Sequence, residues 1–150
     1  KLNEEALANF RNENIGFIFQ FHQLLPEFTA FENICIPGYI KKTNSSELNK
    51  RAIKLMDYLN LGNKINNKPN ELSGGEKQRV AVARSLINNP KLILADEPSG
   101  NLDSKSANSL YNLFFDIRKE FNHTFIIVTH NIDLAKKSDR ILEISDGIIK

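Results

Sequence analysis

The sequence predicts an α/β domain built on a parallel β-sheet. Residues 15–19, 92–95, 125–129 and 141–144 form short apolar runs that are rich in β-branched or aromatic side chains. The first three runs are apolar throughout, as the buried strands of a parallel sheet are. Helical patterns separate the runs, and this alternation is typical of a doubly wound sheet with right-handed crossovers.

Two helices are predicted from apolar positions that repeat every three or four residues. The first covers residues 46–60, where Asn44 and Glu47 form a capping pair and Gly62 is expected to end the helix. The second lies between Asp103 and Phe121. The apolar faces consist of Leu48, Ala52, Leu55, Met56 and Leu59 in the first helix and of Ala107, Leu110, Tyr111, Phe114 and Ile117 in the second.

The whole chain of 150 residues is predicted to form one domain with an insertion. The alternation breaks at about residues 24–76, because this stretch contains Pro26, Pro37, Pro69, two helical patterns and no convincing strand. We interpret it as a mostly helical subdomain inserted into an α/β core of about residues 1–23 and 77–150.

The composition excludes several classes of protein. Hydrophobic residues make up 41% of the chain and charged residues 25%, which is ordinary for a folded domain. The 20 basic and 18 acidic side chains nearly balance, so no nucleic-acid partner is expected. The single cysteine, Cys35, allows no internal disulfide, and no apolar run approaches the length of a membrane span. We therefore expect a soluble domain from a reducing compartment.

Polar side chains follow three of the predicted strands directly. Gln20 follows residues 15–19, Asp96 and Glu97 follow residues 92–95, and His130 follows residues 125–129. Each residue alone would be an ordinary turn or surface residue. Because ligands bind outside the carboxyl ends of parallel strands, their shared position predicts that all of them converge on one crevice.

A second candidate site is the start of a predicted helix after Leu72. Ser73 and Glu76 have the spacing of a capping box, and Gly74 and Gly75 fill the first helical positions. Two glycines there cost roughly 1–2 kcal/mol of helix propensity relative to alanine. A well-capped helix needs no such glycines, whereas a phosphate bound to bare backbone N–H groups would explain them.

These motifs resemble, in order and spacing, those of the ABC ATPases. Residues 73–78 resemble the signature motif, residues 92–98 the Walker B strand with its catalytic glutamate, and residues 99–103 the D-loop. Gln20 is similar to the Q-loop glutamine, and His130 is similar to the switch histidine. The resemblance covers essentially the whole chain and implies a P-loop NTPase-type fold with ATP and Mg²⁺ as ligands.

The resemblance also implies a role for each matching residue. Asp96 would hold Mg²⁺, Glu97 would orient the attacking water, and His130 would contact the γ-phosphate. Gln20 would complete the metal and water shell and couple it to the transport partner. Ser73, Gly74, Gly75 and Gln78 of the signature motif would belong to the nucleotide site across a homodimer interface, and Asp103 would link the two sites.

One family motif is absent from this chain. The phosphate loop G-x-x-x-x-G-K-[ST] has no counterpart, because no glycine in the sequence is followed by lysine. Family members carry this loop upstream of the Q-loop, together with an aromatic residue that stacks on adenine. We therefore expect that the chain is an N-terminally truncated piece and that it is inactive by itself.

The segment after Gln20 narrows the resemblance. Residues 19–33 are similar to those of LolD-type ATPases, which drive lipoprotein release from the bacterial inner membrane. Macrolide-exporter (MacB-type) and cell-division (FtsE-type) relatives share much of this pattern and remain alternatives, as does a soluble non-transport ABC ATPase. The LolD-type resemblance implies membrane permease partners, contacted through Gln20 and the helical subdomain, at the cytoplasmic face of the inner membrane.

Overall fold

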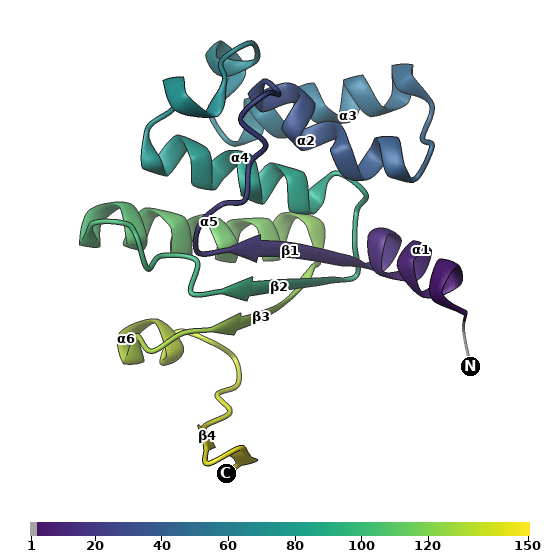
Figure 1. The fold of residues 1–150 in the computed structure, drawn as a ribbon. Coiled ribbons are helices and arrows are strands. Elements are labelled where there is room, and N and C mark those ends of the chain that lie inside the picture. Colours follow the sequence, from purple (N-terminus) through teal and green to yellow (C-terminus); the bar gives the residue numbers. More distant parts are fainter. Residues whose placement is uncertain (1–2) are drawn as a thin grey trace.

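The computed structural model describes residues 3–150 and contains a parallel sheet of three strands (Figure 1). The strands are β1 (Ile15–Phe19), β2 (Leu92–Asp96) and β3 (Thr124–Val128), and their order in the sheet is β1-β2-β3. Ile18 pairs with Ala95, which in turn pairs with Ile127. The α/β class and the first three strands predicted from the sequence are confirmed, with bounds that differ by one residue in β2 and β3.

Helices form two layers above the sheet in Figure 1. The layer next to the sheet contains α4 (Gly74–Leu86) and α5 (Ser104–Phe121), and α2 (Ala30–Ile40) and α3 (Ser45–Tyr58) pack on α4. Helix α1 (Glu4–Asn14) precedes β1, α6 (Ile132–Ala135) follows β3, and short 3-10 turns occupy Gly62–Lys64 and Pro69–Glu71. Among residues 3–150, no helix has the length and apolar character needed to cross a bilayer.

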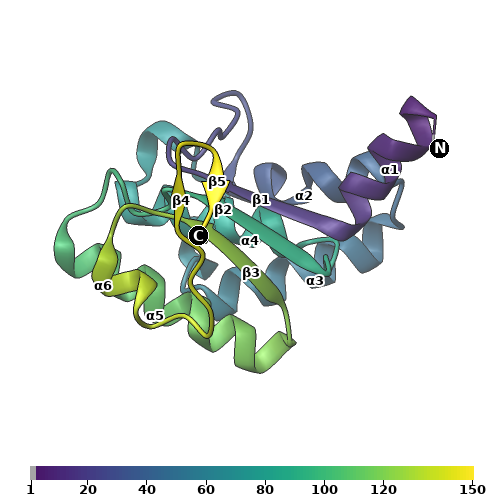
Figure 2. The ribbon, with the colours of Figure 1, turned by 90° about the horizontal axis from the view of Figure 1, so that it is seen from below.

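One face of the sheet carries the core, and the other is open to solvent. Ile18, Ile93 and Ala95 are buried beneath the helices. On the opposite face, Phe17 is 40% exposed and Val128 is 59% exposed. Figure 2, seen from below, shows the strands with α4 and α5 behind them.

This one-sided packing differs from the doubly wound arrangement that the alternation of elements predicted. Both crossovers, from β1 to β2 and from β2 to β3, advance in the same direction across the sheet. Right-handed crossovers that advance in the same direction place their helices on the same face. Crossover helices on both faces would require the strand order to reverse direction, and the order β1-β2-β3 in residues 3–150 has no such reversal.

The fourth predicted strand, residues 141–144, is not part of the parallel sheet. Instead, β4 (Ile144–Ser145) and β5 (Ile148–Ile149) form a small antiparallel hairpin. Asp146 and Gly147 both have positive φ, 53° and 75°, as the central residues of a type I′ hairpin turn do. The Asp-Gly pair therefore determines the local structure here.

The predicted start of α3 is confirmed, but the predicted stop is wrong. The Asn44 side chain accepts hydrogen bonds from the backbone N–H groups of Ser46 and Glu47. The helix ends at Tyr58, and Asn60 takes the left-handed conformation, with φ 55°, that often terminates a helix. Gly62 instead begins the first 3-10 turn. The apolar positions predicted for α3 and α5 are buried in the core, except for Ala107 of α5, which is only partly buried.

Replacing Gly16 with alanine is expected to destabilise the fold by about 2–3 kcal/mol, as overpacking of a core does. A Cβ atom at Gly16 would lie 2.4 Å from the backbone oxygen of Ser85, so β1 and α4 would have to separate. At Gly75 a Cβ atom would meet no other atom within 4 Å, so Gly75→Ala is the matched control. Urea unfolding measures both, and equal midpoints for the two variants would contradict this packing.

Candidate nucleotide site

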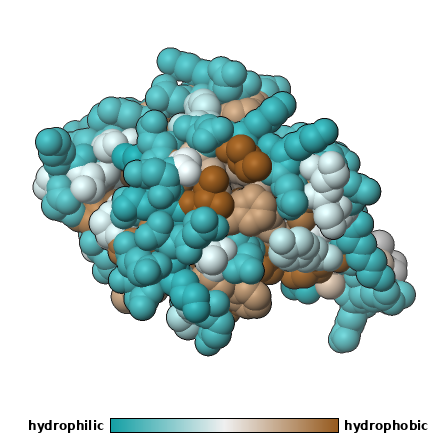
Figure 3. All heavy atoms as spheres, turned by 90° about the horizontal axis from the view of Figure 1, so that it is seen from above, coloured by the Kyte–Doolittle hydropathy of each residue, from teal (hydrophilic) through white to brown (hydrophobic). Residues whose placement is uncertain are grey.

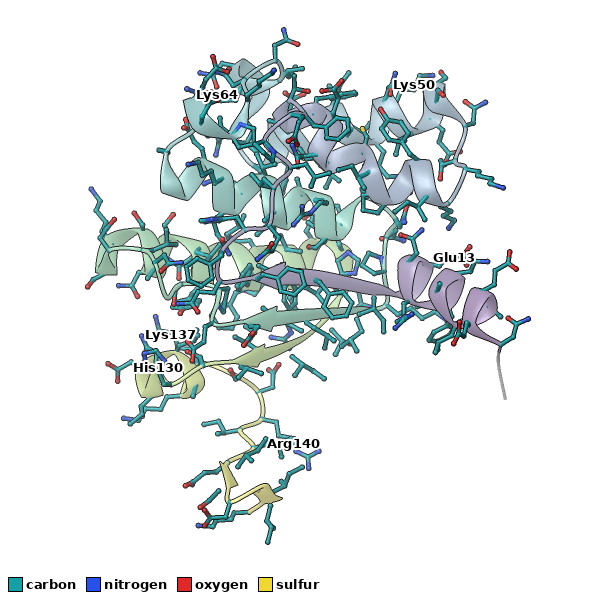
Figure 4. All side chains as sticks on the ribbon, in the orientation of Figure 1. Glu13, Lys50, Lys64, His130, Lys137 and Arg140 are labelled. Carbon is teal, nitrogen blue, oxygen red and sulfur yellow. The ribbon has the colours of Figure 1, made fainter. Side chains whose placement is uncertain are left out.

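Three of the predicted site positions leave the sheet at the same edge. Phe19, Asp96 and Val128 are neighbours in register at the carboxyl ends of their strands. Gln20, Glu97 and His130 follow within two residues, and Figure 4 shows His130 at this edge, beside α6. The edge of the sheet thus brings these side chains to one end of the molecule.

Glu97 and His130 form a hydrogen-bonded pair. The Glu97 Oε1 atom accepts hydrogen bonds from the backbone N–H of His130 at 2.9 Å and pairs with its Nδ1 at 2.8 Å. Glu97 has a φ of 42°, a costly conformation for this residue type, and its N–H donates to the Val128 oxygen. Within residues 3–150, Oε2 of Glu97 has no hydrogen-bond partner, so this oxygen is available to water.

Gln20 lies against the segment that follows Glu97. Its backbone oxygen accepts a hydrogen bond from Asn101 Nδ2 at 3.1 Å. A Cβ atom at Gly100 would lie 2.5 Å from Gln20 Nε2, so the missing side chain at Gly100 makes room for the glutamine. A hydrogen bond between the hydroxyl groups of Ser99 and Tyr111 connects the same segment to α5.

The N-terminus of α4 has the predicted capping box. The Glu76 carboxylate accepts from the Ser73 backbone N–H at 2.8 Å, and the Ser73 hydroxyl accepts from the Glu76 N–H. The Ser73 N–H keeps the pKa of Glu76 below its usual value, and the Lys64 ammonium 3.2 Å from the carboxylate adds to this. Cβ atoms at Gly74 and Gly75 would point into open space, so packing within this chain does not require these glycines.

An open groove runs between the N-termini of α4 and α5. Asp103 caps α5 and accepts hydrogen bonds from the Ser106 hydroxyl at 2.6 Å and from the backbone N–H groups of Lys105 and Ser106. The Ser106 hydroxyl is the main reason that the pKa of Asp103 is lowered. Two helix N-termini face this groove, which favours an anionic ligand. Its lining is Ser73, Gly74, Gly75, Glu76, Arg79, Asn101, Leu102, Asp103 and Ser106.

All the predicted site residues except Gln78 therefore fall into two groups. Asp96, Glu97 and His130 do not line the groove, which contains the signature glycines and Asp103. Gln78 belongs to neither group, because it is only 1% exposed and its side-chain nitrogen and oxygen have no hydrogen-bond partner among residues 3–150. Its position does not support direct contact with a nucleotide.

Asp96 fits a magnesium ion that is held mainly by phosphate oxygens and water. Its side chain is exposed and has no hydrogen bond or ion pair within the described part of the chain. No cluster of three or more His, Cys, Asp or Glu side chains forms a protein-only metal site among those residues. Mg²⁺ commonly binds proteins through one or two carboxylates and the phosphates of a substrate.

Sequence reasoning missed one residue near the site. Arg84 of α4 donates hydrogen bonds to the backbone oxygens of His22 and Gln23, both at 2.6 Å. More than 60 positions separate the partners, and backbone oxygens have no residue-specific signal. No motif in the sequence could have revealed this contact.

The sheet edge, the capped glycines of α4 and the paired Glu97 and His130 fit the class of ABC-type ATPases. The family model described as "ABC transporter" matches residues 1–100. The chain therefore belongs to the ABC transporter family.

The comparisons with individual proteins agree with this assignment. The chain is 56% identical over 150 residues to the lipoprotein-releasing system ATP-binding protein LolD of Bacteroides thetaiotaomicron, covering 100% of this chain and 69% of that protein. It is 57% identical over 148 residues to LolD of Cytophaga hutchinsonii, covering 99% and 68%.

A solved structure shares the fold as well. The post-hydrolysis dimer of the ATP-binding cassette MJ0796, bound to ADP and Pi, superposes with a TM-score of 0.85 at 39% identity. The match covers 100% of this chain and 66% of that cassette. The predicted P-loop NTPase-type fold is thereby confirmed.

Proposed function

We propose that this chain forms part of the ATP-hydrolysing subunit of a transporter that releases lipoproteins from the bacterial inner membrane. The observation that carries the proposal is 53–57% identity, over at least 99% of the chain, to four proteins named as LolD. The geometry at the sheet edge supports the chemistry, because a carboxylate with a free oxygen stands beside a histidine there.

In this proposal, each group at the sheet edge has one task. Asp96 holds Mg²⁺, which would neutralise charge on the phosphates when bound. Glu97 orients the attacking water through Oε2, while Oε1 stays bound to His130. His130, whose side chain is 85% exposed, contacts the γ-phosphate, and Gln20 completes the polar shell. Phosphoryl transfer needs mainly such positioning and charge stabilisation.

The groove between α4 and α5 is proposed to work across a homodimer interface. Its glycines leave the backbone N–H groups at the start of α4 accessible, and nothing in this chain fills the space beside them. A γ-phosphate held by a second copy of the subunit would fit there, with Asp103 connecting the two sites. The solved cassette of the same fold is a dimer, which supports this arrangement.

Gln20 and the helical subdomain of about residues 24–76 are proposed to contact the permease subunits at the cytoplasmic face of the membrane. Figure 3 shows apolar side chains that gather in a patch within the otherwise hydrophilic upper face. Phe21, Leu25 and Phe28, between β1 and α2, are exposed by 68%, 43% and 42%. Exposed apolar residues of this kind are typical of a protein interface.

The proposal can be tested by reconstitution. The full-length protein, together with its membrane subunits in lipid vesicles, should release a lipid-modified protein only when ATP is supplied. The same protein without its acyl chains is the control substrate and should not stimulate ATP turnover. ATP turnover that is indifferent to lipid-modified proteins would reject lipoprotein release and favour the exporter or cell-division alternatives.

A further inference from the structure

The chain leaves β1 through a backbone conformation that needs outside support. His22 and Gln23 are consecutive residues with positive φ, 53° and 49°, and neither is a glycine. Left-handed backbone is unfavourable for L-residues with side chains and persists only where surrounding contacts hold it. We call residues 20–23 the exit segment, because they lead from the end of β1 toward α2.

Arg84 provides this support from the last turn of α4. Its Nη1 atom donates to the Gln23 oxygen and its Nη2 atom to the His22 oxygen, both at 2.6 Å. The planar fork of a guanidinium matches two adjacent acceptors, which a lysine cannot do with the same geometry.

The surroundings of Arg84 make its guanidinium depend on hydrogen bonds to these two backbone oxygens. Arg84 has no carboxylate partner within residues 3–150, and burial lowers its pKa. A desolvated cation is costly unless its hydrogen bonds are made. The same helix, α4, surrounds His22 with positive charge: burial first and then Lys77 and Arg84 lower the pKa of the imidazole, opposed by the Gly74 backbone.

The exit segment is therefore held from two sides. The Gln20 oxygen is bound by Asn101, which lies in the segment after Glu97. Two and three residues further along the chain, the oxygens of His22 and Gln23 are bound by Arg84, which lies on the helix that begins with the signature glycines. A displacement of α4 would thus pull on the backbone that carries Gln20.

We propose that Arg84 is a positioning residue that fixes Gln20 at the sheet edge by clamping the exit segment to α4. The inference rests on the proposed role of Gln20 in ATP hydrolysis. Arg84 itself touches no substrate, and it acts through the backbone of His22 and Gln23.

Arg51 provides a matched control. It also donates to a backbone oxygen, that of Ile87 at 2.8 Å, and it pairs with Glu47 on its own helix. Arg51 lies on α3 and follows Lys50 in the sequence, and Figure 4 shows Lys50 far from His130 and the sheet edge of the site. Arg51→Met removes an arginine-to-backbone contact without touching the exit segment.

The experiment compares Arg84→Met, Arg84→Lys and Arg51→Met in the full-length protein. Arg84→Met should lower kcat for ATP about tenfold or more while KM changes less than about twofold, because misplaced groups slow the chemical step. Hydrogen exchange of the peptide that contains residues 20–25 should accelerate about tenfold. Arg84→Lys should recover part of both losses, and Arg51→Met should show neither.

Equal kcat and equal exchange of this peptide in Arg84→Met and Arg51→Met would overturn the proposal. If Arg84→Met does not fold, Arg84→Lys decides, since wild-type kcat and exchange in that variant would show that the two-pronged clamp is not needed. If the wild-type protein hydrolyses no ATP, the proposed function fails, while the exchange comparison still tests the clamp.

Discussion

Glu97→Gln in the full-length protein is expected to lower the rate of ATP hydrolysis by a factor on the order of 10² or more, as for loss of a general base. The substitution keeps the size of the side chain. It also leaves an oxygen that can accept from the His130 backbone N–H, whose nitrogen lies 2.9 Å from Glu97 Oε1 in the wild-type structure. It removes the negative charge that would orient the water. Steady-state turnover measures the effect.

ATP binding should survive in the same variant, and ATP-loaded dimers should accumulate because the nucleotide is not consumed. Gel filtration with ATP detects them. Glu13→Gln is the control, since Glu13 lies on α1, away from the sheet edge that carries His130 in Figure 4. Turnover of the Glu97→Gln protein within a factor of ten of the control would exclude the proposed role of Glu97.

The parts of the fold that local sequence determines could be predicted. Strands β1 to β3 are short apolar runs, and their strand conformation follows from that composition, although one face of the sheet is open to solvent and β3 has no fully buried residue. The starts of α3 and α5 follow from Asn44 and Asp103, whose side chains cap the next backbone N–H groups. These features depend on residues within about one helical turn, so a single sequence contains the necessary information.

Features that depend on competition or on tertiary contacts could not be predicted in the same way. Helix α1 has no buried residue, and its two large apolar side chains, Leu7 and Phe10, form too short a pattern to indicate a helix. At the end of α3, Asn60 terminates the helix before Gly62 is reached. Residues 141–144 are apolar enough for a strand, but the Asp146-Gly147 turn places only Ile144 in a hairpin.

The candidate site shows the same division. Gln20, Glu97 and His130 were predicted to converge because each follows a strand, and parallel strands end at one edge. The positive φ of Glu97 and the contact of Arg84 with the exit segment have no signature in the sequence. Gln78 matches a family motif, yet its burial separates it from the groove.

Gly75→Asp distinguishes a ligand-binding helix start from a plain helix cap. A side chain at Gly75 meets no atom of this chain within 4 Å, and acidic residues suit the first turn of a helix. If α4 is only capped, the variant should be as stable and as active as the wild type. If the groove faces the γ-phosphate of a second subunit, the new carboxylate is placed against a polyanion.

The expected repulsion is large enough to decide between these outcomes. Two unit charges 4 Å apart at an effective dielectric constant of about 20 repel by roughly 4 kcal/mol. ATP-dependent dimerisation and turnover of the full-length Gly75→Asp protein should therefore collapse, while nucleotide binding to the monomer stays nearly unchanged. Ser46→Asp, at the equivalent exposed position of α3, is the control because it adds the same charge to another first helical turn. Both variants add a carboxylate two residues after a capping residue, so a loss of turnover confined to Gly75→Asp would come from the groove and not from helix α4 itself. Normal turnover in Gly75→Asp would leave the glycines with a structural role only.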